Sequence, residues 1–157
     1  MRMAWLIAAS GLGVVACGGS GGSGSGSGSG ITSTNKGCSF MFNGSYTFTY
    51  VATSGDCPSI PAEHAPVTAQ PGTPAAQQNL SNACPGGSGS EVATPASAGG
   101  CVIDGNFTGC QASGSSQTFD ISEQVTWNAG YTAATGTVSL SVSGGCAGGY
   151  AVTVSQP

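Results

Sequence analysis

The sequence predicts an all-β domain over residues 36–157, and three observations lead to that class. Several segments alternate apolar and polar residues with a period of two, which is the side-chain period of a strand. Serine and threonine occupy most of the intervening positions, as in an antiparallel sheet with one solvated face. Only one short segment resembles a helix. We therefore expect a small antiparallel meander that forms a barrel or sandwich of about five to seven strands.

The first expected strand has an aromatic face. Five aromatic residues between positions 40 and 50 share one parity: Phe40, Phe42, Tyr46, Phe48 and Tyr50. Thr47 and Thr49 lie between the last three, so the opposite face is polar. Gly44 interrupts the pattern, and we expect the strand to bend there.

Three more strands are expected towards the C-terminus. Residues 119–127, 138–142 and 150–154 alternate between large apolar and polar side chains. The segment 128–130 is a turn signal, and the glycine-rich segment 144–149 predicts a loop. These three strands would follow one another as a meander.

Residues 55–100 form a different kind of segment. They contain seven of the eight prolines and few large apolar side chains. We interpret this segment as a long excursion held at Cys57 and Cys84. Within it, Thr73 and Pro74 are typical of a helix start, and a short helix is expected through Leu80.

The N-terminus has the features of an export signal. Arg2 precedes an apolar run over residues 3–16, which is too short to cross a bilayer as a helix. The run ends in Val14-Val15-Ala16-Cys17, which resembles the lipobox of bacterial lipoproteins. The resemblance implies cleavage before Cys17 and attachment of diacylglycerol to its thiol. It also implies residence in the cell envelope, and Gly18 after the cysteine favours the outer membrane of a Gram-negative bacterium.

These features divide the chain into three parts. Residues 1–16 are the expected signal peptide, and residues 17–35 the lipidated cysteine with a flexible tether. Gly18 to Gly30 are all glycine or serine, which predicts a coil. Residues 36–157 are the expected β domain.

The seven cysteines support export. If Cys17 carries lipid, an even set of six remains for three disulfides: Cys38, Cys57, Cys84, Cys101, Cys110 and Cys146. Their pairing is open, because six cysteines allow 15 pairings. If residues 101–110 form one strand, Cys101 and Cys110 lie about 30 Å apart and cannot bond, whereas a hairpin at Asp104-Gly105 would allow it.

Composition excludes several function classes. Only 5% of residues are charged, and Lys36 is the only Lys or Arg after the signal segment, so nucleic-acid partners are excluded.

No cysteine pair has a zinc spacing. Asp104 to Gly109 resembles the start of a calcium loop, but Ser115 replaces the required glutamate. We expect no metal and no cofactor. His64 lies in the proline-rich excursion and is interpreted as an exposed loop residue.

Glu123 is the position that departs from the strand pattern. It shares the parity of Phe119, Ile121, Val125 and Trp127, so a regular strand would bury it. A buried carboxyl group has a raised pKa and is a mark of functional sites. A β-bulge or a rim position would instead let it reach water, and this second interpretation is preferred. Trp127 is expected in the core.

The sequence therefore predicts a non-enzymatic, membrane-anchored envelope lipoprotein with a structural or interaction role. Its partners would be the lipid bilayer, through N-terminal acyl chains, and an unidentified protein or glycan; we expect a monomer. The alternative is a module that binds a small molecule or glycan, with a site lined by Tyr46, Phe48, Glu123 and Trp127. A hydrolase using Glu123 or His64 is the third possibility.

Overall fold

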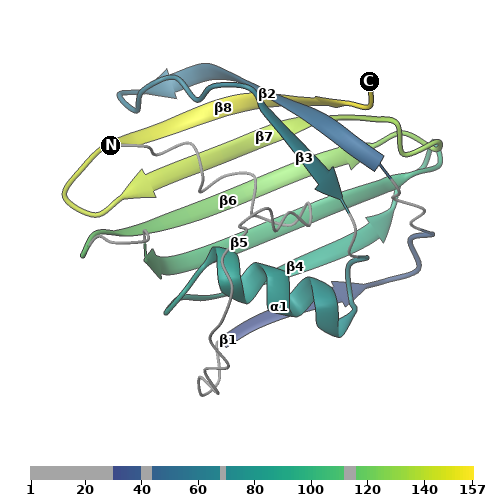
Figure 1. Ribbon diagram of the computed structural model, residues 1–157, viewed down its shortest axis with the longest axis horizontal. Coiled ribbons are helices and arrows are strands. Elements are labelled where there is room, and N and C mark those ends of the chain that lie inside the picture. The colour runs from purple at the N-terminus through teal and green to yellow at the C-terminus, as the bar shows by residue number, and fades with distance from the viewer. Residues whose placement is uncertain (1–29, 40–43, 68–69, 112–115) are drawn as a thin grey trace.

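A computed structural model describes residues 30–39, 44–67, 70–111 and 116–157, which form one eight-stranded sheet and one helix (Figure 1). The predicted all-β class is confirmed, and the described residues contain three disulfides. The elements are β1 (Gly30–Asn35), β2 (Gly44–Gly55), β3 (Glu63–Val67), α1 (Pro74–Ala83), β4 (Ser88–Pro95), β5 (Cys101–Gln111), β6 (Thr118–Trp127), β7 (Ala133–Val142) and β8 (Ala147–Ser155).

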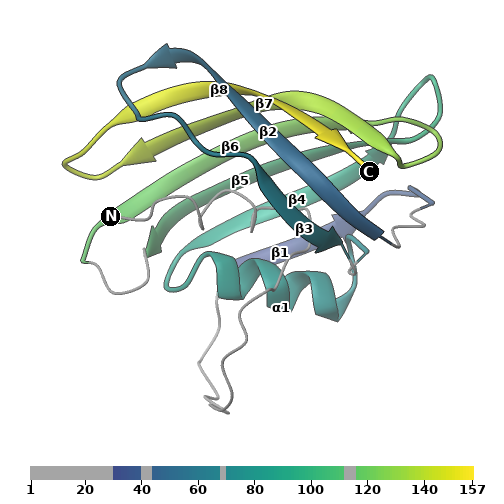
Figure 2. The same ribbon diagram turned by 45° about the horizontal axis from the view of Figure 1, so that its top comes forward.

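The strand order is β1-β4-β5-β6-β7-β8-β2-β3. The run from β4 to β8 is an antiparallel meander, of which β6, β7 and β8 were expected from the sequence, whereas β1 pairs with β4 in parallel. The sheet has eight strands, more than expected, and its outer strands β1 and β3 do not pair with each other, so it does not close into a barrel. Figure 2 shows how the sheet curves, with β2 and β3 passing over one end of it.

Three of the strands lie where no strand was expected. β1 occupies the last six residues of the expected tether, so the sheet includes residues that precede position 36; its Ile31 is fully buried. β3 and β4 lie in the proline-rich excursion. Proline is compatible with them because Pro66 is on an edge strand and Pro95 is the last residue of β4.

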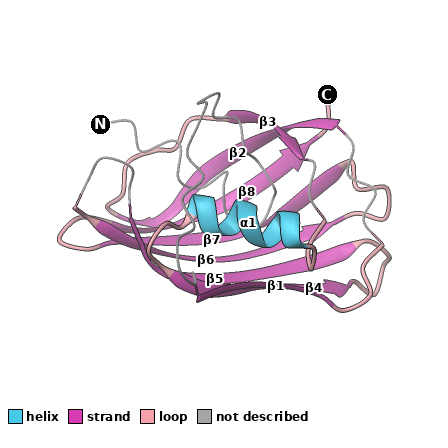
Figure 3. Cartoon of the chain, turned by 60° about the horizontal axis from the view of Figure 1, so that its bottom comes forward, coloured by secondary structure: helices cyan, strands magenta, loops and turns pink. Residues whose placement is uncertain are grey.

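The expected short helix is present as α1. The Thr73 side chain caps it by accepting a hydrogen bond from the Ala76 amide at 3.2 Å, and Pro74 is its first residue. Ala76 and Leu80 are its buried residues. The helix lies across the inside of the curve, next to β1 (Figure 3).

The sheet has a buried inner face and an exposed outer face. Along β6 every odd-numbered residue is buried and every even-numbered one from Asp120 to Thr126 is exposed. The inner faces of all eight strands contribute to a single apolar cluster, which Leu80 of α1 joins. Because the described residues form no second sheet over this face, its burial among them depends on the curvature of the sheet and on α1.

The six cysteines after Cys17 form three disulfides: Cys38–Cys101, Cys57–Cys146 and Cys84–Cys110. β5 runs as one strand from Cys101 to Gln111, without a hairpin. Cys101 and Cys110 therefore bond to other cysteines, as expected if residues 101–110 form a single strand. The first disulfide joins the chain after β1 to the start of β5. The second ties the segment after β2 to the β7–β8 loop, and the third ties the end of α1 to β5.

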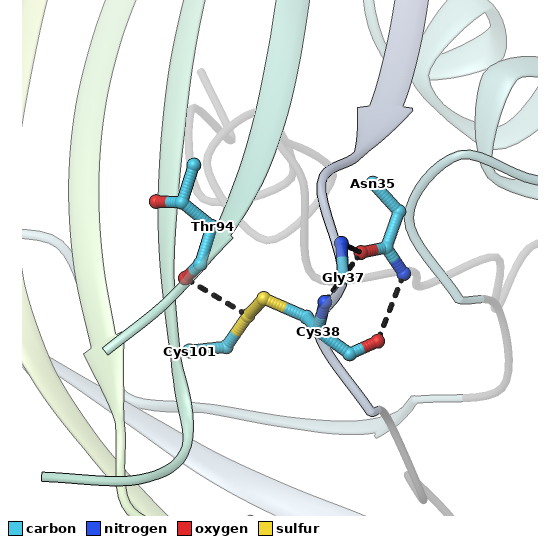
Figure 4. The surroundings of a disulfide bond; sticks show 5 residues. All are labelled: Asn35, Gly37, Cys38, Thr94 and Cys101. Atoms are coloured by element: carbon cyan, nitrogen blue, oxygen red, sulfur yellow. Dashed lines mark hydrogen bonds between the residues drawn. A yellow bond between two sulfur atoms is a disulfide. The ribbon is translucent and has the colours of Figure 1, made fainter. Parts of the chain in front are cut away.

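Asn35 positions Cys38 for its disulfide (Figure 4). The Asn35 Oδ1 atom accepts hydrogen bonds from the amides of Gly37 at 3.0 Å and Cys38 at 2.8 Å. Its Nδ2 atom donates to the Cys38 carbonyl at 3.0 Å. Gly37 has φ 103°, a conformation that favours glycine, and this lets the chain turn after β1.

We expect the double variant Cys57→Ser/Cys146→Ser to unfold at a lower urea concentration than the wild type. The disulfide closes a segment with a sequence separation of 89, so its removal should cost about 2–4 kcal/mol. Urea titration followed by circular dichroism measures this, with Ser143→Ala in the same exposed loop as the control. Equal midpoints, or a peptide map with different cysteine pairs, would contradict the arrangement.

Candidate functional site

All three glutamates of the chain face the inner side of the sheet. Glu63 is on β3, Glu91 on β4 and Glu123 on β6. Glu91 is 1% exposed and Glu123 is 5% exposed, while Glu63 is partly buried and its Oε2 atom is inaccessible. We call these three residues the inner acid cluster. Burial of a carboxyl group is costly, so a cluster of this kind needs a physical explanation.

Two of these glutamates lie in one transverse row of the sheet. The strand register places Ser33 opposite Glu91, Glu91 opposite Gly105, and Gly105 opposite Glu123. Residues in one row project from the same face. With neighbouring strands about 4.8 Å apart, the Cα atoms of Glu91 and Glu123 are separated by roughly 10 Å.

Gly105 leaves the space between these two glutamates without a side chain. A Cβ atom built on Gly105 would lie 2.9 Å from both Cγ and Oε1 of Glu123, and 2.9 Å from a ring carbon of Phe107. The Glu123 side chain therefore leans over β5, towards the strand that carries Glu91. The absent side chain is what allows this approach.

Glu91 is oriented by one hydrogen bond on the β1 side. The Ser33 hydroxyl donates to Oε1 of Glu91 at 2.8 Å and accepts from the Gly72 amide at 2.8 Å. Glu91 is thereby linked to the loop that precedes α1. Its Oε2 atom is buried and has no hydrogen-bond partner among the described residues.

Burial raises the pKa of two members of the inner acid cluster. The pKa of Glu91 is raised from 4.5 to about 7 by burial, and the Ser33 hydrogen bond opposes this rise. Burial also raises the pKa of Glu63 to about 7. The pKa of Tyr50 is raised by burial first and then by the charges of Glu63 and Glu123, so this phenol lies near both carboxyl groups.

The four residues proposed from sequence for a ligand site are all buried on the inner face: Tyr46, Phe48, Glu123 and Trp127. Tyr46 and Trp127 pack edge to face with ring centroids 5.3 Å apart, and the Tyr46 hydroxyl donates to the Tyr131 carbonyl at 2.9 Å. The expected core position of Trp127 is confirmed. For Glu123 the bulge interpretation is wrong, because β6 keeps a regular register on both sides of it.

Sequence reasoning did not identify Glu63 and Glu91. Both lie in the proline-rich excursion, where the inward positions next to them hold small residues, Ala65 and Ala93. Such positions produce little apolar alternation. The one available signal was the shared parity of Glu91 and Ala93 in β4.

Other sequence candidates lie apart from the cluster. His64 is exposed, with its Nδ1 atom 2.9 Å from the Thr47 hydroxyl. Asp104 belongs to β5 and accepts a hydrogen bond from Gln124, so the calcium-like segment is a strand. The described residues contain no group of three or more His, Cys, Asp or Glu suited to a metal ion. Cys17, Phe40 and Phe42 lie outside the described residues.

The outer face contains an open groove of about 540 Å³. Ser54 of β2 lines it, and the polar lining from β5, β6 and β7 consists of Asn106, Thr108, Asp120, Ser122, Ser139 and Ser141. All six are exposed residues that alternate with buried ones. The groove thus offers hydroxyl, amide and carboxylate groups on the face opposite the inner acid cluster.

Comparisons with known proteins found no matching family model, no similar curated protein and no similar solved structure. Within the described part of the chain, α1 is the only helix, and its ten residues are too few to cross a membrane. Function must therefore be argued from the molecule itself.

We expect the protein to lose stability as the pH rises from about 4.5 to about 7. The folded state holds a proton on Glu91 more tightly than the unfolded state, so the contribution is complete below pH 4.5 and lost as pH passes the folded pKa. For Glu91 the loss should amount to about 2–3 kcal/mol. Urea unfolding at pH 5 and pH 8 measures it.

The variant Glu91→Gln tests the source of this pH dependence. It should be more stable than the wild type at pH 8 and show a smaller change between the two pH values. The outer-face variant Asp104→Asn is the matched control and should follow the wild type. An unchanged pH dependence in Glu91→Gln would refute the assignment.

Gly105→Ala should destabilise the domain by about 1–3 kcal/mol, as overpacking does. Its methyl group would meet the Glu123 side chain and the Phe107 ring at 2.9 Å. Gly130→Ala is the control, since its nearest neighbours would be 3.8 Å away or more. Thermal unfolding compares the two, and equal midpoints would show that Glu123 does not lie over Gly105.

Proposed function

We propose that this protein is a lipid-anchored protein of the bacterial envelope, held at a membrane by acyl chains on Cys17. The β domain would stand off the membrane on the Gly/Ser segment that begins at Gly18. By the resemblance of Val14-Val15-Ala16-Cys17 to a lipobox, and with Gly18 following, the outer membrane of a Gram-negative bacterium is the proposed location.

The observation that carries this proposal is the use of cysteine. Three disulfides engage all six cysteines after position 17. Disulfides of this kind form in oxidising compartments, which supports export. The remaining cysteine, Cys17, lies at the end of the apolar N-terminal run, where lipidation would occupy its thiol.

For the domain we propose an interaction role without catalysis. The outer groove supports it, because exposed serine, threonine and asparagine side chains can bond an uncharged polar partner such as a glycan or a protein loop. A domain with one exposed Lys and no other Lys or Arg among the described residues is unsuited to nucleic acid.

Ligand binding at the inner face is the second candidate function. It is favoured by the placement of Glu123, Tyr46, Phe48 and Trp127 on one face together with Glu91. A hydrolase using Glu123 or His64 ranks third, because Glu123 lies on the buried inner face whereas His64 is exposed and bonds to Thr47, so the two do not form a catalytic pair.

We expect the mature protein to begin at Cys17 and to carry acyl mass on that residue. Intact-mass and peptide mass spectrometry of membrane-purified protein measure both. Cys17→Ala should abolish the acyl mass and the membrane association, because the thiol is the attachment point. Ser20→Ala in the same segment is the control and should behave as the wild type. Recovery of a full-length, unacylated chain with reduced thiols would overturn the proposal.

A further inference from the structure

The outer groove lies across the strands of the sheet and not along them. Its lining residues come from β5, β6, β7, β8 and β2, which are consecutive in the sheet. The strand register aligns one residue of each strand in a single outer-face row: Asn106, Ser122, Ser139, Gly149 and Ser54. With neighbouring strands about 4.8 Å apart, this row is roughly 19 Å long. The groove therefore has the shape of a site for a linear ligand.

Both ends of the groove lie at irregularities in the sheet. The register shifts after Phe107 at the β5 end and after Ala52 at the β2 end. The disulfide at Cys110 lies beside the first shift, and the disulfide at Cys57 comes shortly after the second. β-Bulges redirect side chains and are frequent next to functional sites. Because the two disulfides hold these ends, the groove is formed before a ligand arrives, which lowers the entropic cost of binding.

The absence of a side chain at Gly149 keeps the groove open near its β2 end. Gly149 is the one member of the row without a side chain, and a Cβ atom built there would lie 2.7 Å from the Ser54 Oγ atom. A larger residue at this position would fill the space between Ser139 and Ser54, its neighbours in the row.

The groove offers side-chain groups that can both donate and accept hydrogen bonds. Asp120 is held by the Gly109 amide, which donates to its Oδ1 atom at 2.8 Å, so Oδ2 is left to accept from a ligand. The side chains of Asn106, Ser122 and Ser139 make no hydrogen bond within the described part of the chain. Amide and hydroxyl groups of this kind complement the hydroxyl groups of a sugar.

The lining disfavours two other kinds of partner. The five strands are interior strands that pair on both sides, so a peptide cannot add to them by main-chain pairing. Asp120 is the only charged residue among the described lining residues, and it is negative, so an anionic chain would be repelled. A linear ligand with many hydroxyl groups and no charge meets neither obstacle.

We propose that the outer groove binds a linear, uncharged glycan, which lies across β5 to β2 and is held by hydrogen bonds from Asn106, Asp120, Ser122 and Ser139. This inference rests on the interaction role proposed above and names the partner for it. The glycan crosses the strands above the Gly149 position, where it comes closest to the main chain of the sheet.

The test is calorimetric titration of the acylated, disulfide-bonded protein, kept in a detergent without a sugar headgroup. Two probes are cellohexaose and the hexamer of β-1,4-linked N-acetylglucosamine, which share a linear uncharged chain and differ in the acetamido group. We expect saturable binding of at least one, and the tighter of the two identifies the kind of sugar. The matching disaccharide should bind at least tenfold more weakly, because it fills only part of the groove. No binding of either hexamer, or equal binding of the disaccharide, would overturn the proposal.

Two pairs of variants locate the binding. Gly149→Val should abolish it by filling the groove, whereas Ala151→Val, on the outer face of the same strand but outside the lining, should bind as the wild type does. Ser139→Ala should weaken it about fivefold, as the loss of one hydrogen bond does. Thr137→Ala, next to it on the same face of β7 and outside the lining, is its control. All four positions lie on the outer face, so the variants are expected to fold, and unchanged thermal midpoints establish that they do. Unchanged binding by Gly149→Val would refute the assignment to the groove.

A peptide probe separates failure of this inference from failure of the proposed function. A ten-residue peptide of alternating glycine and serine has the same reach without sugar rings. If it binds more tightly than the glycans and Gly149→Val abolishes that binding, the glycan proposal is overturned while the interaction role stands. If neither the peptide nor a glycan binds, the interaction role of the groove fails as well. Acylation of Cys17 is measured separately and does not depend on either result.

Discussion

The alternation of side chains about one curved sheet is the constraint on which this structure depends. A strand directs successive residues to opposite faces, so a single sheet has only one interior to share among all its strands. Here that interior receives the apolar residues of eight strands and three glutamates as well. The position of each glutamate is therefore inseparable from the register of its strand.

Burial of the inner acid cluster lowers the stability of the folded state, and interactions elsewhere in the fold must compensate for this loss. Two nearly inaccessible carboxyl groups oppose folding when they are ionised. The three disulfides restrict the unfolded chain and offset part of that cost. Buried carboxyl groups with such a cost are often functional, which is why Glu91 and Glu123 are candidates for a site.

Local signals in the sequence were sufficient for some elements and insufficient for others. The helix start at Thr73-Pro74 and the alternation over residues 119–127 depend only on residues close in the sequence. The helix and the strand that they predicted, α1 and β6, are both present. β1 and β4 pair in parallel across a long connection, and β4 has only Glu91 and Ala93 as buried residues. Nothing local to those segments reveals that they are strands.

The sequence by itself determined the all-β class, the even set of six cysteines for disulfides, and the inward parity of Glu123. These follow from the period of a strand and from cysteine chemistry, which act locally. Only the tertiary structure decided which cysteines pair and that Glu91 and Glu123 flank Gly105. The physical reason is register: residues far apart in the chain become neighbours only when the hydrogen bonds between strands align them.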